Sequence, residues 1–148
     1  MTTSRARCYG AVMATKDQLP GDVKAPDLLL PVEIRDGLKT STLGRERIDY
    51  CPVIDSTNVR ARMLADEGAP EGTIVVAEAQ LKGKGRRGRS WFSPAGQGIY
   101  VSVILRPRVP PAEATLLVLM AAVAAAEALL SHADLPVSVK WPNDILIG

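Results

Sequence analysis

Histidine, cysteine and aromatic residues are scarce in this chain of 148 residues. His132 is the only histidine, which excludes a histidine-rich metal site and argues against a Ser-His-Asp triad. Cys8 and Cys51 are the only cysteines, and they are far apart in the sequence. Two unclustered cysteines do not form a disulfide framework or a metal site, so we expect two free thiols in a reducing compartment.

Long apolar runs are also absent. The N-terminus has no apolar segment of the kind that directs secretion. The longest apolar run, residues 116–126 with an extension to residue 130, is interrupted by Glu127 and is shorter than the ~20 residues of a membrane span. A net charge of +2 excludes a globally basic nucleic-acid binder. We therefore expect a soluble, cytoplasmic protein with a buried helix here and no membrane span.

Hydrophobic periodicity predicts one domain that mixes strands and helices. Residues 1–43 are irregular, with a short strand and one helical turn within 28–43, and Gly44 is the expected boundary of the main domain. The strand at 48–54 contains Pro52, which indicates an edge or irregular strand. Strands are expected at 48–54, 73–80, 98–106, 137–141 and 145–148. Helices are expected at 58–67, with Val59, Met63 and Leu64 as the candidates for its inward face, and at 111–130, buried on most faces.

The segment KGKGRRGR at residues 82–89 places five cations in eight positions among glycines. The like charges repel one another and the glycines remove backbone restraint, so the segment is not built for a core. One interpretation is a lid that binds an anion through backbone N–H groups and arginine forks, with Trp91 covering the closed site. Single-stranded RNA binding and a solvated surface loop remain alternatives. The Walker A pattern is absent.

Three further polar segments are ambiguous when taken alone. Residues 55–58 read DSTN, which caps a helix but offers more polar side chains than one cap uses. Gln80 ends an apolar strand, where ligands of α/β sheets often bind, although a plain strand end explains it equally well. Asn143 and Asp144 follow Pro142 in a turn that needs no function.

In combination and in this order, these segments resemble the biotin protein ligase family. The matching segments are IDSTN at 54–58, GTIVVAEAQ at 72–80, GKGRRGRSWFSPAGQGIYVSVILRP at 83–107 and VKWPNDILI at 139–147. The resemblance covers about residues 44–148. It implies an α+β fold: a mixed β-sheet flanked by helices, related to class II aminoacyl-tRNA synthetases.

The resemblance also implies an activity and its partners. Members of the family use ATP to convert biotin to biotinoyl-5′-AMP, with Mg²⁺ on the phosphates. They then transfer the biotinoyl group to a lysine of a biotin carboxyl carrier protein, which belongs to acetyl-CoA carboxylase or a related carboxylase. A homodimer is possible in this family, whereas DNA binding is not expected of this chain.

The site residues implied by the resemblance form two groups. Biotin would be bound by Ser56, Thr57, Asn58, Gln80, Lys84, Gly85 and Arg86, and ATP or the adenylate by Arg86, Arg89, Trp91, Asn143 and Asp144. Lys84 and Arg86 would be the catalytic residues, because bringing a carboxylate to ATP requires positive charge that arrives with the substrates. No protein metal ligands are implied.

This sequence departs from the family pattern in three respects. Lys84 stands where the family usually has arginine, so the charge is kept and the bidentate fork is lost. The family's catalytic lysine, in a K-x-x-G-I-L segment after the WPND turn, would fall beyond Gly148, so we expect a truncated catalytic domain. Residues 1–43 are too short for the winged helix of many relatives and resemble only its wing and linker.

Other functions remain open on the sequence alone. A lipoate or octanoate ligase is disfavoured because the R-x-x-G-G-G segment and its nearby histidine are absent. An RNA-binding module would need more aromatic and basic surface than this composition provides. A non-catalytic, biotin-binding or regulatory fragment cannot be distinguished from a partial ligase.

Overall fold

The computed structural model of the chain describes residues 9–10, 28–85, 88–133 and 135–148. The chain divides into two compact units, Met1–Arg106 and Pro107–Gly148. The first unit contains a five-stranded mixed sheet, and the second contains a two-stranded antiparallel sheet. The expectation of a mixed sheet flanked by helices is confirmed.

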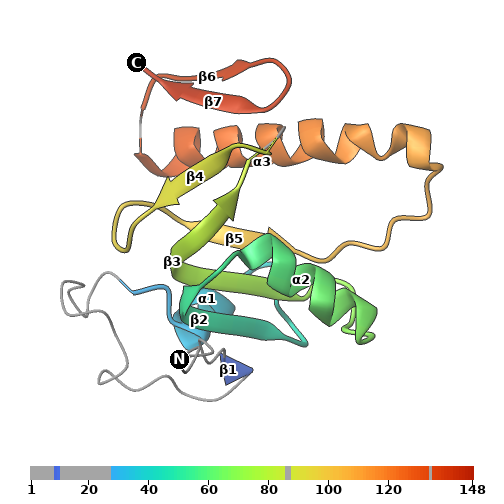
Figure 1. Cartoon of the computed structure of the whole chain (residues 1–148). Helices are drawn as coiled ribbons and strands as arrows, with labels where there is room; N and C mark the ends of the chain where they lie inside the picture. The colour runs from blue at the N-terminus through green and yellow to red at the C-terminus, as the bar shows by residue number, and fades with distance from the viewer. Residues whose placement is uncertain (1–8, 11–27, 86–87, 134) are drawn as a thin grey trace. The chain divides into compact units, whose positions relative to one another are not determined.

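In the first unit, β3 is the central strand of the sheet (Figure 1). It pairs in parallel with β2, and α2 provides the crossover between them, as a parallel pair requires. Strand β1 pairs antiparallel with the other edge of β2. The elements of this unit are β1 (Tyr9–Gly10), α1 (Pro31–Gly37), β2 (Ile48–Ile54), α2 (Thr57–Asp66), β3 (Ile74–Lys84), β4 (Ser90–Ser93) and β5 (Tyr100–Val103).

Two strands share the remaining edge of β3. Its first half pairs antiparallel with β5, from Ile74 opposite Val103 to Ala77 opposite Tyr100. Its second half pairs antiparallel with β4, and Gln80, opposite Ser93, begins that ladder. Gln80 therefore lies where the partner of β3 changes from β5 to β4, close to the point where β2 ends.

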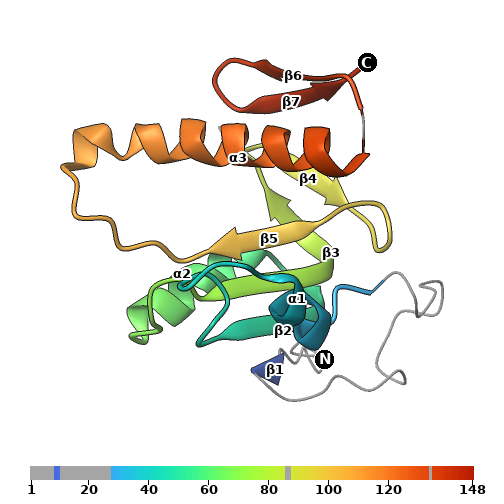
Figure 2. The same cartoon turned by 180° about the vertical axis from the view of Figure 1, so that it is seen from behind.

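Helices α1 and α2 cover opposite faces of this sheet, as the front view of Figure 1 and the reverse view of Figure 2 both show. Side chains alternate between the faces along each strand. Ile48, Tyr50, Ile74 and Val76 pack against residues of and around α1, including Ile34 and Leu38. Val75 packs with Ala61 and Leu64 of α2. Residues 28–43 thus contribute to this core through a helix, and the short strand expected there does not form.

The buried face of α2 differs from the predicted one. Thr57, Ala61 and Leu64 are buried, with the four- and three-residue spacing of one helix face. Met63 is 49% exposed, so the prediction that it points inward is wrong. Leu64 continues the buried spacing, and Met63 lies one position off it.

Two expectations about β2 are resolved by its surroundings. The strand lies between β1 and β3, but β1 pairs only with Tyr50 and Asp49, so Pro52 meets no partner from β1. This is how an internal strand tolerates a proline.

Cys51 is fully buried and disulfide-bonded, so the prediction of a free thiol is wrong for this residue. Cys8 lies outside the described residues, so the prediction made for it is not addressed.

The second unit consists of η4 (Pro111–Glu113), α3 (Thr115–Ala133), β6 (Val137–Lys140) and β7 (Asp144–Ile147). The predicted helix and hairpin are confirmed, but the expectation that the helix is buried on most faces is wrong. Within α3 only Ala122 and Ala126 are buried, because a two-stranded sheet is too small to cover a helix with apolar residues on most of its faces. By length and composition Pro111–Ala133 could cross a membrane, which is weak evidence because soluble core helices meet the same criterion.

Gly72, just before β3, packs closely against the backbone of Thr42, and its replacement tests that contact. Gly68 and Gly72 both have positive φ, +86° and +78°. A Cβ on Gly68 would meet open space, whereas one on Gly72 would strike the backbone carbonyl of Thr42. We expect Gly68→Ala to cost about 1–2 kcal/mol through backbone strain alone, and Gly72→Ala roughly 1 kcal/mol more because Thr42 must move. Urea unfolding of both variants measures this difference, and equal losses would contradict it.

Candidate ligand-binding site

A polar network joins the start of α2 to the point where β3 changes partner. Gln80 Oε1 accepts two hydrogen bonds from Thr57, one from its backbone N–H at 2.9 Å and one from its hydroxyl at 3.1 Å. The parallel register that sets Ile54 opposite Gln80 brings these residues together, although 23 positions separate them. Two residues singled out in the sequence, Thr57 and Gln80, are therefore in direct contact.

The same network reaches β4 and β5. Gln80 Nε2 donates to Ser93 Oγ at 3.3 Å. On the other side, Ser102 Oγ lies 3.0 Å from Thr57 Oγ1. Ser93 is buried and Ser102 half-buried, so the network is held at the edge of the core. Neither serine was predicted as a site residue, because an isolated serine in a strand carries no sequence signal of its own.

The other two polar residues of the DSTN segment lie on either side of Thr57. Ser56 is the N-cap residue of α2, is buried, and makes no side-chain cap hydrogen bond. Its carbonyl accepts the first helical bond, from Arg60 N–H at 3.1 Å. Asn58 is exposed. Ser56 thus takes the N-cap position through its backbone alone, and the Thr57 hydroxyl donates a hydrogen bond to Gln80 instead of capping the helix.

The first three residues of the basic segment belong to a β-hairpin, so the expectation that the loop begins directly after Gln80 is wrong. Strand β3 runs on to Lys84, which pairs with Ser90, and Gly83 pairs with Trp91. The turn is closed by a hydrogen bond from Gly85 N–H to the Arg89 carbonyl at 2.8 Å, and Gly88 has φ +74°. Arg86, predicted as catalytic and ligand-binding, and Arg87 lie outside the described residues.

Close strand pairing explains why a glycine is needed inside this hairpin. A Cβ on Gly83 would lie 2.9 Å from the Trp91 carbonyl oxygen and 3.0 Å from Ser93 Oγ, so the strands could not approach as they do. The aromatic side chains are nevertheless uncovered: Trp91 is 68% exposed and Phe92 89%. The hairpin thus presents an exposed tryptophan beside exposed Arg89.

The two lysines of the hairpin differ in their surroundings. Lys82 is bound to the end of β2: its N–H donates to the Asp55 carbonyl at 2.8 Å, and its Nζ lies 3.1 Å from Asp55 Oδ2. Lys84 is exposed, and its side chain forms no hydrogen bond or ion pair with the described residues. Within this part of the chain, Lys84 is therefore a cation available to a ligand.

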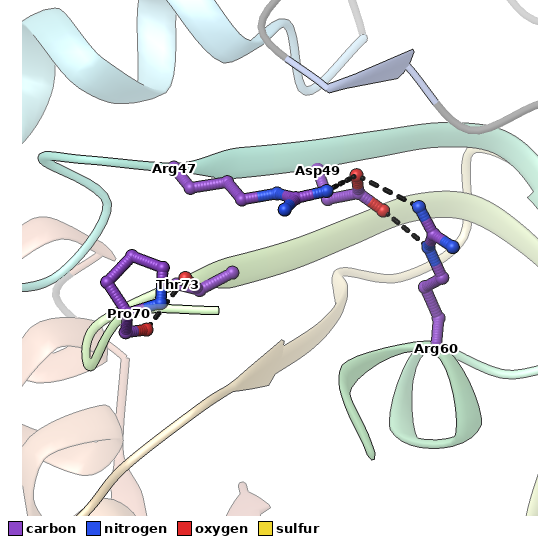
Figure 3. A network of polar contacts seen from close by, with 5 residues as sticks. All are labelled: Arg47, Asp49, Arg60, Pro70 and Thr73. Atoms are coloured by element: carbon purple, nitrogen blue, oxygen red, sulfur yellow. Dashed lines mark hydrogen bonds and ion pairs between the residues drawn. The ribbon is translucent and has the colours of Figure 1, made fainter. Parts of the chain in front are cut away.

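A buried ion pair fixes α2 against β2 (Figure 3). Asp49 is fully buried and accepts hydrogen bonds from Arg60 Nε at 2.8 Å and from Arg47 at 3.4 Å. The hydrogen bond with Asp49 raises the pKa of Arg60 above its ordinary value. Because Arg60 lies one turn after Ser56, the pair determines where the start of α2 meets the sheet. The sequence signal for Asp49 was a charge within an apolar strand.

Glu78 is a second carboxylate within the sheet, and its hydrogen-bond partners lie on the side of the sheet that α1 covers. Its Oε1 accepts hydrogen bonds from Tyr50 at 3.0 Å and from Leu29 N–H at 2.9 Å. Burial, followed by the charge and hydrogen bond of Glu78, raises the pKa of Tyr50 well above its usual range. These contacts attach the segment before α1 to the central strand, two residues before Gln80.

Asn143 and Asp144 belong to the second unit, where both are exposed. Asn143 ends the turn between the two strands, and Asp144 begins β7 opposite Lys140. Among the described residues, no group of three or more His, Cys, Asp or Glu could hold a metal ion.

A polar network thus lies where the central strand changes partner, beside the end of β2 and at the start of the basic hairpin. Ligands of open α/β sheets often bind at such strand ends. Residues 50–148 match the model of the biotin/lipoate A/B protein ligase family. The chain belongs to this family, as the resemblance of its motifs predicted.

Named relatives are similar to this chain over part of their length. The bifunctional ligase/repressor BirA of Bacillus spizizenii is 47% identical over 126 residues, which cover 85% of this chain and 38% of that protein. The chain thus spans about two fifths of the length of this relative.

Solved structures of biotin protein ligases also match this chain over part of their length. The biotin protein ligase of Aquifex aeolicus in complex with biotin and ATP has a TM-score of 0.53 and 35% identity, covering 66% of this chain and 40% of that one. The biotin protein ligase of Leishmania major in complex with biotin has a TM-score of 0.55 and 28% identity, covering 68% and 46%.

Proposed function

We propose that this chain is part of a biotin–protein ligase and supplies its biotin site and much of its ATP site. The ligase would join biotin to ATP to form biotinoyl-5′-AMP and then transfer the biotinoyl group to a lysine of a carrier protein. Family membership supports the activity, and solved relatives have been obtained with biotin and ATP. The observation that carries the proposal is the contact between Thr57 and Gln80, the residue at which the β3–β4 hairpin begins.

The polar ring of biotin would bind at this network. Four residues would contact the ring. The start of α2 provides Ser56, Thr57 and Asn58, and β3 provides Gln80 at the position where its partner changes from β5 to β4. A buried ligand that carries both hydrogen-bond donors and acceptors needs fixed polar partners, because unpaired polar groups are costly to bury. Because the side chains of this network are already hydrogen-bonded to one another, they can act as such partners with little loss of conformational entropy on binding.

The biotin carboxylate and the phosphates would bind along the hairpin. Lys84, Gly85 and Arg86 would contact the carboxylate, with Lys84 and Arg86 as the catalytic cations. A carboxylate attacking an ATP phosphorus brings two anions together, and cations at that point lower the barrier. The hairpin offers Lys84 for this role because Lys82 is already paired with Asp55.

The nucleotide would bind with Arg86, Arg89, Trp91, Asn143 and Asp144. Exposed Trp91 offers a face for stacking on a base, and Arg89 offers charge for phosphate. Mg²⁺ would neutralise phosphate charge. It would be bound mainly by the phosphates and water, a common arrangement for this ion.

The acceptor would be a biotin carboxyl carrier protein of acetyl-CoA carboxylase or a related carboxylase, in the cytoplasm. We propose no DNA contact and no membrane contact for this chain. A homodimer is consistent with the family and is part of the proposal.

Replacement of Gln80 tests the proposed biotin site. We expect Gln80→Ala to weaken biotin binding about five- to tenfold. The substitution removes the proposed hydrogen bond to the ligand and also the acceptor of the Thr57 N–H. Gln97→Ala is the matched control, since Gln97 is exposed and lies in the turn after β4. Calorimetric titration of biotin into each variant measures both affinities. Equal affinity in the two variants would remove Gln80 from the site.

A further inference from the structure

The hydrogen bonds around Thr57 can run in only one direction. The backbone N–H of Thr57 can only donate, so the Gln80 atom that faces it at 2.9 Å is the carbonyl oxygen. That oxygen can only accept, so the Thr57 hydroxyl, at 3.1 Å, donates its single proton to it as well. The contact between Ser102 Oγ and Thr57 Oγ1 at 3.0 Å must then be a hydrogen bond that Ser102 donates.

This direction also fixes the amide end of Gln80. With the oxygen facing Thr57, the Nε2 group faces β4 and donates one proton to Ser93 Oγ. An amide nitrogen carries two protons, so one donor remains available within the described part of the site. The network therefore offers a hydrogen-bond donor to a ligand oxygen.

We propose that Ser102 is a positioning residue of the ligand site. Its hydroxyl directs the Thr57 proton toward Gln80, and this holds the carboxamide with its N–H donors turned to Ser93 and to an acceptor oxygen of the ligand. Ser102 acts through Thr57 and does not itself contact Gln80. Without it, the Thr57 hydroxyl is free to rotate, and the Gln80 oxygen loses one of the two hydrogen bonds that hold it. The identity of the ligand as biotin rests on the proposed function, but the positioning role does not.

The ligand-free chain tests the positioning role directly. In ¹H–¹⁵N spectra of the wild type, we expect the two side-chain amide protons of Gln80 to give distinct signals, with the proton that is bonded to Ser93 the slower to exchange with water. Ser102→Ala should shift these signals and speed their exchange, and Ser102→Thr, which keeps a hydroxyl and suits a strand, should restore them. Identical Gln80 signals in the wild type and Ser102→Ala would overturn the proposal.

Biotin titration gives a second, independent readout. We expect Ser102→Ala to weaken biotin binding about three- to tenfold, with Ser102→Thr near the wild type. In a Thr57→Val background, Ser102→Ala should cause no further loss, because its effect passes through the Thr57 hydroxyl. Additive losses would overturn the proposal. A wild type that does not bind biotin would instead contradict the proposed function, and the amide spectra would still decide the role of Ser102.

Discussion

Asp49→Ala is expected to lower the free energy of unfolding by about 3–5 kcal/mol. Asp49 is fully buried and is the shared partner of Arg60 and Arg47. Removing the carboxylate leaves the Arg60 guanidinium, 25% exposed, against the sheet without its partner at 2.8 Å. Because whole domains are stable by only ~5–15 kcal/mol, a loss of this size is a large part of the total. Urea unfolding followed by circular dichroism measures it.

The chain contains a matched control for this change. Asp55 pairs with Lys82 at a similar distance, 3.1 Å, but the side chains are 57% and 74% exposed. Asp55→Ala should therefore cost no more than about 1 kcal/mol. Should Asp49→Ala prevent folding altogether, Arg47→Ala, which removes only the longer contact at 3.4 Å, supplies an intermediate value. Equal small losses from Asp49→Ala and Asp55→Ala would show that the buried pair does not anchor α2.

Lys84→Ala is expected to weaken biotin binding by about 2 kcal/mol, or roughly thirtyfold, because a hydrogen bond to a charged ligand group is lost. Lys82→Ala removes the same charge from the same strand, but its ammonium group is already bound by Asp55. It should change the affinity by less than about twofold. Calorimetry at constant ionic strength compares the two variants.

The neutral amide of biotin identifies which ligand group Lys84 contacts. If Lys84 binds the carboxylate, Lys84→Ala should weaken binding of biotin and leave binding of biotinamide nearly unchanged. The difference between the two ligands removes any general effect of the substitution on the fold. An equal loss for both ligands, or equal effects of Lys82→Ala and Lys84→Ala, would contradict the assignment.

The sequence predicts the elements of this fold better than the contacts between them. Strands at 48–54 and from 73 onward, the helix between them and the final hairpin follow from periodicity and turn residues. Strand β4 was missed because it is short and directly follows glycines and arginines, which are typical of a loop. Its formation depends on a ladder in which Gly83 lets Trp91 approach closely, which no local pattern reveals.

The candidate site shows the same division. Thr57 and Gln80 are recognisable as surplus polar residues at a helix start and a strand end. Their contact depends on the parallel register of β2 and β3, which is a tertiary property. Ser93 and Ser102 carry no pattern and become visible only when the strands are assembled around Gln80.

Titration of biotin into the 148-residue chain, with and without ATP and Mg²⁺, tests the central claim most directly. We expect saturable binding of biotin to one site, and tighter binding when ATP and Mg²⁺ are present, because the hairpin cations then contact both anions. Circular dichroism and cooperative unfolding of the same sample establish that it is folded. A folded chain that shows no heat of binding at millimolar biotin, with or without ATP and Mg²⁺, would contradict the assignment of a biotin site to this chain.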